Sequence, residues 1–238
     1  CIDDCFEQVF PVDALINYNA YHTRFPYEET YGGRTKLLLG TDYVPLREEF
    51  GVTQVRDAQD EEKGFSVLLS SGGGDVQNAI LGILQRAVQI EELQAVTFHV
   101  VVGVYHPQGD AIEAFAKKHE NVKVYRPCFD MAGVMADCDA AVSAAGTMLF
   151  ELSAMGVPTV FFQSADNQRY DREFFEAKER MLFAGDITHD REACIEAVCE
   201  GLKRLLTDGA LRERMKERLA EVTDGHGAER IAEEIMGL

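Results

Sequence analysis

From residue 64 onward, short apolar segments alternate with segments in which apolar residues recur every three or four positions. The segment 64–70 is apolar almost throughout, which is typical of a parallel strand buried on both faces. In the segment 76–89, residues such as Ile80, Ile83 and Leu84 lie on one side of a helix. We therefore predict a strand over 64–70 and a helix over 76–89.

The same alternation repeats to the end of the chain and predicts a sheet built from strand and helix units. Further strands are expected over 96–102, 122–125, 140–144, 159–162 and 181–184. Further helices are expected over 110–119, 130–136, 147–155, 168–178, 191–206, 210–222 and 228–236. Strands separated by helices in this way predict an α/β fold with a doubly wound, largely parallel sheet. Such sheets bind ligands outside the carboxyl ends of their strands.

The first part of the chain has a different pattern. A strand end is expected over 1–4 and short strands over 14–17 and 36–40, whereas 51–63 is polar. Because so few residues cannot complete a Rossmann-like domain, we expect residues 1–50 to be the tail of an amino-terminal domain of that type. Residues 51–63 are then expected to be a linker, and residues 64–238 a Rossmann-like ligand-binding domain.

Composition limits the classes of partner. The chain has 23 basic and 41 acidic residues, a formal charge of -18, which disfavours nucleic acid and anionic membranes. No segment approaches the roughly 20 apolar residues that span a membrane, and the first residues do not have the pattern of a signal peptide. An anionic ligand must therefore be bound by local donors, such as the backbone N–H groups at helix starts.

The cysteines and histidines do not predict a metal site. None of the 6 cysteines forms a C-x-x-C pair, and the 6 histidines are scattered. Reduced, partly buried thiols in a cytoplasmic protein are the expected state. His106 follows a strand end and is a candidate to face a cleft, although surface positions are expected for the histidines in general.

Two glycine-bearing turns follow strands and precede helices. In the first, Ser71, Gly72 and Gly73 let the backbone approach a phosphate, while the following helix offers N–H donors. The alternative is a tight turn without a ligand, since neither a Walker loop nor Gly-x-Gly-x-x-Gly is present. In the second, Gly146 and Thr147 open a helix that the Thr147 hydroxyl is expected to cap.

Two further polar positions accompany these turns. Glu151 lies one turn into the second helix, where a carboxylate can accept hydrogen bonds from ribose hydroxyls, or else simply favours the helix dipole. The loop 164–168 is placed to touch a sugar or phosphate. Its alternative reading is a capped loop with Asp166 or Asn167 as N-cap.

Several motifs in their order along the chain resemble a known family. They include Ile2-Asp-Asp4, Leu46-Arg-Glu-Glu-Phe50, Ser71-Gly-Gly-Gly-Asp75, Ser143-Ala-Ala-Gly-Thr-Met-Leu-Phe-Glu151 and Ala165-Asp-Asn-Gln168. Together they resemble the PseG/SpsG-like UDP-sugar hydrolases of pseudaminic acid and spore-coat polysaccharide synthesis. This group has the GT-B architecture and is related to the murein glycosyltransferase. The resemblance covers nearly the whole chain but not the opening of the family's amino-terminal domain.

The resemblance implies a role for each matching position. The backbone at Cys128 and Phe129 would meet the uracil, and Glu151 the ribose. The diphosphate would lie among Ser71, Gly72, Gly73, Gly146 and Thr147. Asn167 and Gln168 would reach the sugar, and Asn167 is the candidate contributor to catalysis. The family's Gly-x-Gly-His-x-x-Arg motif with its catalytic histidine has no counterpart in this chain.

The implied function is the nucleotide-binding part of a hydrolase that releases UDP from a UDP-linked deoxy-diacetamido sugar. UDP or the UDP-sugar is the expected ligand, with no required cofactor and no metal site. Two alternatives stay open. One is the donor-binding half of a glycosyltransferase, and the other is a non-catalytic binding subunit. In each case the cleft is expected to be completed by the missing amino-terminal domain or by a partner chain.

Overall fold

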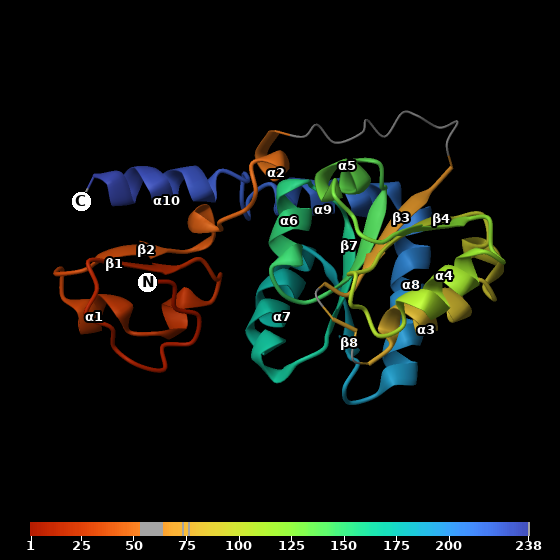
Figure 1. Ribbon diagram of the computed structural model, residues 1–238, viewed down its shortest axis with the longest axis horizontal. Coiled ribbons are helices and arrows are strands. Elements are labelled where there is room, and N and C mark those ends of the chain that lie inside the picture. Colours follow the sequence, from red (N-terminus) through yellow and green to blue (C-terminus); the bar gives the residue numbers. More distant parts are fainter. Residues whose placement is uncertain (53–63, 73, 76, 238) are drawn as a thin grey trace.

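The computed structural model describes residues 1–52, 64–72, 74–75 and 77–237. The expected linker therefore lies outside the described residues from residue 53 to residue 63, as does Gly73. Two parallel sheets organise the chain, a small one in its first fifty residues and a six-stranded one in the rest (Figure 1).

The small sheet and its helices, residues 1–52, are called the first unit here. Strands β1 (Ala14–Asn17) and β2 (Lys36–Leu39) pair in parallel, and Ile2 forms a bridge to Ile16 on the other edge of β1. The short helices are η1 (His22–Arg24), α1 (Tyr27–Tyr31), η2 (Thr41–Tyr43) and α2 (Glu49–Val52). None of these helices was predicted, because three to five residues are too few to display a helical period.

The large sheet has the strand order β5-β4-β3-β6-β7-β8, all parallel. Its strands are β3 (Ser66–Ser70), β4 (Thr97–Val101), β5 (Val122–Tyr125), β6 (Ala140–Ala144), β7 (Thr159–Gln163) and β8 (Leu182–Asp186). The chain builds outward from β3 in one direction and then, from β6, in the other. The predicted doubly wound parallel sheet is confirmed, and its topological switch point lies between β3 and β6.

Helices cover both faces of this sheet. They are α3 (Ala79–Ala87), α4 (Gly109–Ala116), α5 (Met131–Ala136), α6 (Met148–Ala154), α7 (Arg169–Glu176), α8 (Arg191–Thr207) and α9 (Gly209–Leu219). Short turns of 3₁₀-helix are η4 (Glu91–Leu93), η5 (Asp166–Gln168) and η6 (Ala177–Glu179). Helices α3, α4 and α8 lie on one side of the sheet and α6 and α7 on the other (Figure 1).

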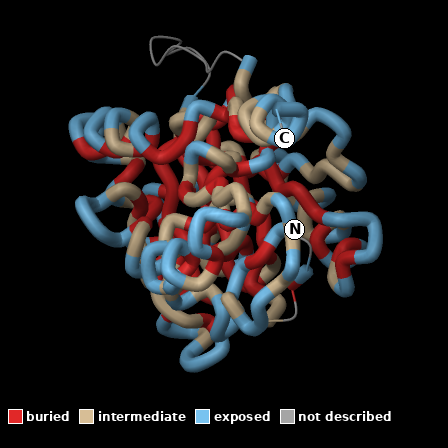
Figure 2. Tube along the Cα trace, turned by 90° about the vertical axis from the view of Figure 1, so that its left-hand side faces the viewer, coloured by how far each residue is buried: buried red, intermediate tan, exposed pale blue. Residues whose placement is uncertain are grey.

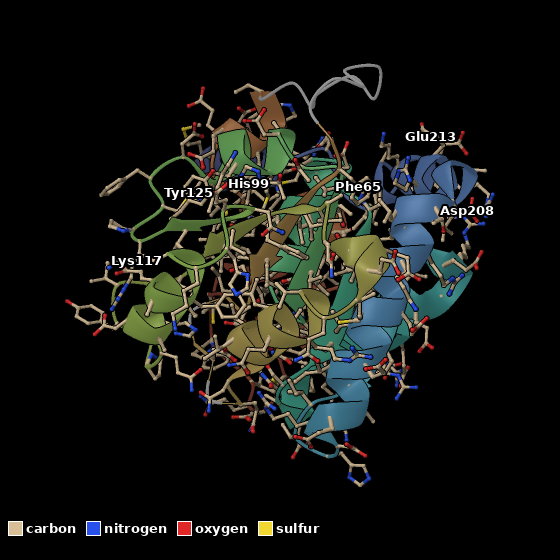
Figure 3. All side chains as sticks on the ribbon, turned by 90° about the vertical axis from the view of Figure 1, so that its right-hand side faces the viewer. Phe65, His99, Lys117, Tyr125, Asp208 and Glu213 are labelled. Carbon is tan, nitrogen blue, oxygen red and sulfur yellow. The ribbon has the colours of Figure 1, made fainter. Side chains whose placement is uncertain are left out.

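The central strands β3, β6 and β7 are buried along their whole length, as their uninterrupted apolar sequences predicted. Buried segments run through both the first unit and the large sheet (Figure 2). Near the outer edge of the sheet, His99 on β4 stacks on Tyr125 of β5, with its Nδ1 2.8 Å from the phenol oxygen (Figure 3). Burial lowers the pKa of His99. The expectation of surface histidines is thus wrong for His99.

The last helix, α10 (Gly227–Met236), leaves the large sheet and lies along the first unit (Figure 1). Arg230 donates to the backbone oxygen of Asp42 at 3.0 Å, and Lys36 forms an ion pair with Glu234. The first and last segments of the chain are therefore packed together, which the linear pattern of apolar residues did not indicate.

Candidate functional site

A cleft of about 640 Å³ opens at the carboxyl ends of the strands, around the switch point between β3 and β6. That volume lies within the range of roughly 300–1,000 Å³ found for small-molecule sites. Segments following five strands of the large sheet contribute to its wall. The lining includes Ser71, Gly72, Gly74, Gly103, Cys128, Ala145, Gly146, Thr147, Glu151, Ser164 and Gln168. Most of the residues predicted separately from the sequence are thus brought together in one place.

Two glycines in the cleft have backbone conformations that other residues rarely adopt. Gly72 has φ +74° and Gly146 has φ +131°. A Cβ atom added at Gly72 would meet no heavy atom within 4 Å, so the turn requires glycine for its backbone angle and not for lack of space. Gly73, the third predicted residue of the first turn, lies outside the described residues.

The second turn presents a row of unpaired backbone donors. Within the described chain, the N–H groups of Gly146, Thr147 and Met148 have no hydrogen-bond acceptor. They precede and open α6, where the helix dipole favours negative charge. This part of the cleft is suited to an anionic oxygen.

The first turn differs from its prediction. Helix α3 begins at Ala79, after the left-handed Asn78, and the buried Asp75 carboxylate accepts hydrogen bonds from Ala79 and Ile80 at 2.7 and 2.9 Å. Those two helix-start donors are therefore occupied by the chain itself. The first turn offers the cleft its glycine backbone and the buried Ser71, but not these donors.

Thr147 also acts differently from the prediction. It occupies the N-cap position of α6, but its side chain makes no capping hydrogen bond. Its φ of -54° and ψ of -31° are already helical, whereas a capping side chain usually requires an extended backbone. Burial raises the pKa of the Tyr18 phenol in the first unit, and the nearby Thr147 side chain opposes that shift. Thr147 thus links the second turn to the first unit.

Glu151 lines the cleft one turn into α6, as predicted. Burial raises the pKa of its carboxyl group, and the nearby Arg47 opposes that shift. The carboxylate is therefore partly desolvated and lies near a positive charge, in a position to accept hydrogen bonds from hydroxyl groups.

Arg47 is a cleft residue that sequence reasoning missed. It comes from the first unit, just before α2, and its guanidinium lies 3.1 Å from a Glu49 carboxylate oxygen and 5.1 Å from the centre of the Phe50 ring. Among the described residues that line the cleft, no other side chain is cationic. The available signal was the Leu46-Arg-Glu-Glu-Phe50 motif, which was used for the resemblance but not assigned a role.

The loop after β7 is held by Gln168. Its Oε1 accepts from the backbone N–H groups of Ser164 and Ala165 at 2.7 and 3.2 Å. The alternative reading of this loop is wrong, because Asp166 and Asn167 lie inside η5 and the N-cap position belongs to Ala165. Asn167 is exposed and is not among the residues that line the cleft.

The segment after β5 contributes Cys128 to the wall of the cleft. Burial raises the pKa of its thiol, so the thiol is not activated as a nucleophile. The neighbouring Phe129 is 87% exposed and lies outside the cleft lining. Cys128 thus lies in the cleft wall, whereas Phe129 presents its side chain to the solvent.

The remaining candidates for chemistry do not form a second centre. His106 is buried, and its Nε2 lies 3.5 Å from an Asp75 carboxylate oxygen behind the first turn. The expectation that it faces the cleft is wrong. In the part of the chain that the structure describes, no three His, Cys, Asp or Glu residues are grouped as metal ligands. No helix in that part is long and apolar enough to cross a membrane.

Comparison with known proteins identifies the family to which this chain belongs. The family model described as LpxB, lipid-A-disaccharide synthetase, matches residues 41–165, more than half of the chain. The chain belongs to the lipid-A-disaccharide synthetase family. The matched region runs from the segment of Arg47 to the loop after β7, so it contains most of the cleft wall.

Two curated relatives are similar to the chain over longer stretches than the family model matches. The spore coat polysaccharide biosynthesis protein SpsG of Bacillus subtilis is 25% identical over 92% of the chain and 63% of its own length. A UDP-2,4-diacetamido-2,4,6-trideoxy-beta-L-altropyranose hydrolase of Campylobacter jejuni is 24% identical over 58% of the chain and 48% of its own length. The chain thus spans less than two thirds of either relative. The resemblance to PseG/SpsG-like proteins is confirmed.

Solved structures confirm the fold of this chain. The UDP co-structure of S. aureus MnaA matches 94% of the chain and 60% of its own length, with a TM-score of 0.64 and 12% identity. The glycosyltransferase WaaG, involved in lipopolysaccharide biosynthesis, matches 96% of the chain with a TM-score of 0.58 and 17% identity. The chain therefore has a Rossmann-like sheet of the GT-B type.

Proposed function

We propose that this chain forms the nucleotide-binding part of an enzyme that releases UDP from a UDP-sugar in surface glycan synthesis. The observation that carries the proposal is the cleft at the switch point, where unpaired N–H groups at Gly146 and Thr147 lie near Glu151. The diphosphate is assigned to Gly72, Gly146 and Thr147, the ribose hydroxyls to Glu151 and the uracil to the backbone at Cys128. Asn167, exposed beside the cleft, is assigned to the sugar.

This arrangement suits the departure of a diphosphate. When the bond between the sugar and the diphosphate breaks, negative charge accumulates on the leaving oxygen. Preorganised N–H donors and the Arg47 guanidinium stabilise that charge, which is a major part of catalysis in such reactions. With Glu151 assigned to the ribose, the proton acceptor for an attacking water is assigned to residues outside the cleft wall described above.

Hydrolysis is the proposed reaction because a relative is named as a hydrolase of a UDP-linked diacetamido sugar. The proposed substrate is accordingly a UDP-linked deoxy-diacetamido sugar of the pseudaminic acid type. Transfer of the sugar to an acceptor is the second candidate, and the match to the lipid-A-disaccharide synthetase family favours it. Both reactions need the same diphosphate site, so an acceptor requirement for UDP release would separate them.

Isothermal calorimetry with UDP, and with CDP and ADP as controls, tests the binding site. We expect UDP to bind more tightly than either control. In the Glu151→Ala variant we expect UDP affinity to fall roughly 10-fold, the effect of losing a hydrogen bond to a charged group, with pyrophosphate affinity unchanged. Equal losses for UDP and pyrophosphate would contradict the ribose assignment. Equal affinity of the unmodified chain for all three nucleotides would overturn the proposal.

A further inference from the structure

Gln168 joins the loop after β7 to the second glycine turn. Its Nε2 donates to the backbone oxygen of Ala145 at 2.7 Å, and its Oε1 accepts from Ser164 N–H at 2.7 Å and Ala165 N–H at 3.2 Å. The Ser164 hydroxyl adds a further donor to Oε1 at 3.2 Å. One side chain thus holds two walls of the cleft together.

These bonds determine which way the amide points. Two backbone N–H groups can only donate, so the atom they meet must be the oxygen, and the atom facing the Ala145 carbonyl must be the nitrogen. The reversed amide would place N–H against N–H and oxygen against oxygen. The orientation of Gln168 is therefore set by its surroundings before any ligand arrives.

The nitrogen still has a hydrogen to donate. An amide nitrogen carries two hydrogens, and only the Ala145 carbonyl accepts from Nε2 among the residues that the structure describes. Nε2 is also the nearest heavy atom, at 4.0 Å, to the position that a Cβ on Gly146 would occupy. Gln168 lines the cleft, so this remaining donor lies beside the unpaired N–H groups of Gly146 and Thr147.

We propose that Gln168 donates this second Nε2 hydrogen to a phosphate oxygen seated beside Gly146, and so recognises the diphosphate instead of the sugar hydroxyls. The inference rests on the proposed function, since it adds a donor to the same anion site. It changes the role of Gln168 from a sugar ligand to a phosphate ligand that also positions the second turn.

Two substitutions remove the Nε2 donor. Gln168→Met keeps a similar length without donor or charge. Gln168→Glu keeps acceptors for Ser164 and Ala165 but loses both donors and adds a negative charge. We expect UDP and pyrophosphate affinities each to fall roughly 10-fold or more in both variants, the effect of losing a hydrogen bond to a charged group. Asp166→Asn, an exposed change in the same η5 turn, is the matched control and should bind both ligands like the unmodified chain.

The pH dependence tests whether the charge and the lost donor of the introduced carboxyl weaken binding. On acidification, the carboxyl introduced by Gln168→Glu gains a proton, loses its charge and regains a donor. Its affinity deficit relative to the unmodified chain should therefore shrink as the pH falls, while the deficit of Gln168→Met should stay constant. Thermal unfolding of each variant, followed by circular dichroism, identifies any loss of affinity that comes from unfolding.

The outcomes distinguish this inference from the proposed function. Unchanged UDP and pyrophosphate affinities in both folded Gln168 variants, with binding by the unmodified chain intact, would overturn the inference alone. A loss confined to UDP-sugars, with UDP unaffected, would restore the sugar role and would also overturn it. Failure of the unmodified chain to bind UDP would overturn the proposed function and this inference together.

Discussion

Gly146 combines a special backbone angle with a position in the cleft wall. Its φ of +131° is in a region that residues with a Cβ rarely adopt, and it lies in the cleft wall. Gly156, at the other end of α6, also has a positive φ, +60°, but does not line the cleft. The two glycines therefore separate the effect of backbone strain from the effect on a ligand.

We predict that Gly146→Ala and Gly156→Ala each lower the free energy of unfolding by about 1–2 kcal/mol because of backbone strain. Only Gly146→Ala should weaken UDP binding, by roughly 10-fold or more, since strain there displaces the phosphate-facing N–H groups. Denaturant unfolding and calorimetry measure the two effects. If both variants bind UDP like the unmodified chain, the phosphate assignment at Gly146 fails.

Asp171 on α7 is a buried carboxyl at the contact between α7 and the first unit. It is 7% exposed, and its Oδ1 has no hydrogen-bond partner among the described residues. Burial, reinforced by the neighbouring Asp4, raises its pKa from 3.8 to about 7. Asp4 belongs to the first unit, so the charge state of Asp171 also affects how the two parts of the chain meet.

The consequence is a stability that falls as the pH rises. Between pH 3.8 and about 7 the folded chain holds the Asp171 proton, whereas the unfolded chain has lost it. The folded state is therefore more stable at the acidic end of this range. The free energy of unfolding falls by about 1.4 kcal/mol for each unit by which the pH rises across it. Asp171→Asn should remove this component, which denaturant unfolding at several pH values measures. The same pH dependence in the variant would show that Asp171 does not hold the proton.

At the scale of elements, the helices differ in which residue satisfies the N–H groups of their first turn. Helices α8 and α9 are capped by the side chains of Asp190 and Asp208, which accept from Ala193 and Leu211. Helix α3 is capped by Asp75 from four residues upstream. Gly227, the first residue of α10, packs directly on the backbone of Val44 in the first unit.

Gly227→Ala should therefore dislodge α10. The added Cβ would overlap the backbone oxygen and nitrogen of Val44, which cannot rotate away as a side chain can. Gly209→Ala is the matched control, because Gly209 is also the first residue of a helix and its Cβ would meet only the end of Arg212, at 3.5 Å. We expect a loss of about 1–3 kcal/mol for Gly227→Ala and little change for the control. Thermal unfolding of both variants measures the difference. Equal midpoint temperatures would contradict the predicted loss of stability in Gly227→Ala.

At the scale of the whole molecule, the first unit and the large sheet both contribute residues to the cleft. Arg24 stacks over Tyr170 of α7, 4.6 Å from the ring centre, and also pairs with Glu173. Tyr21 packs on the same Tyr170 ring at 5.1 Å. These contacts hold the first unit against α7, while Arg47 brings a positive charge into the cleft of a molecule whose net charge is -18.

We predict that Arg47→Gln weakens UDP binding roughly 10-fold, since a charge-assisted contact to a phosphate is lost. Arg34→Gln is the control, because Arg34 is an exposed arginine of the first unit away from the cleft. Both variants change the net charge equally, so any difference between them reports a local contact. Equal affinities in calorimetry would mean that the first unit contributes no charge to the nucleotide site.

The sequence by itself determined the large sheet. Strands such as 66–70 and 159–163 are apolar on both faces, and that pattern depends only on burial, not on which strand lies next to which. The turn at Gly146 and the carboxylate at Glu151 were also predictable, because the direction of a parallel sheet places every strand's carboxyl end at one edge.

Only the tertiary structure decided which side chains come together at that edge of the sheet and which groups they contact. Asp75 accepts hydrogen bonds from the first N–H groups of α3, and Gln168 connects two loops. Arg47 of the first unit lines the cleft. Each of these depends on contacts within a turn or between segments far apart in sequence, and such contacts leave no periodic signal along the chain. Periodicity records how much of each segment is buried, whereas hydrogen-bond partners are selected by the geometry of the folded molecule.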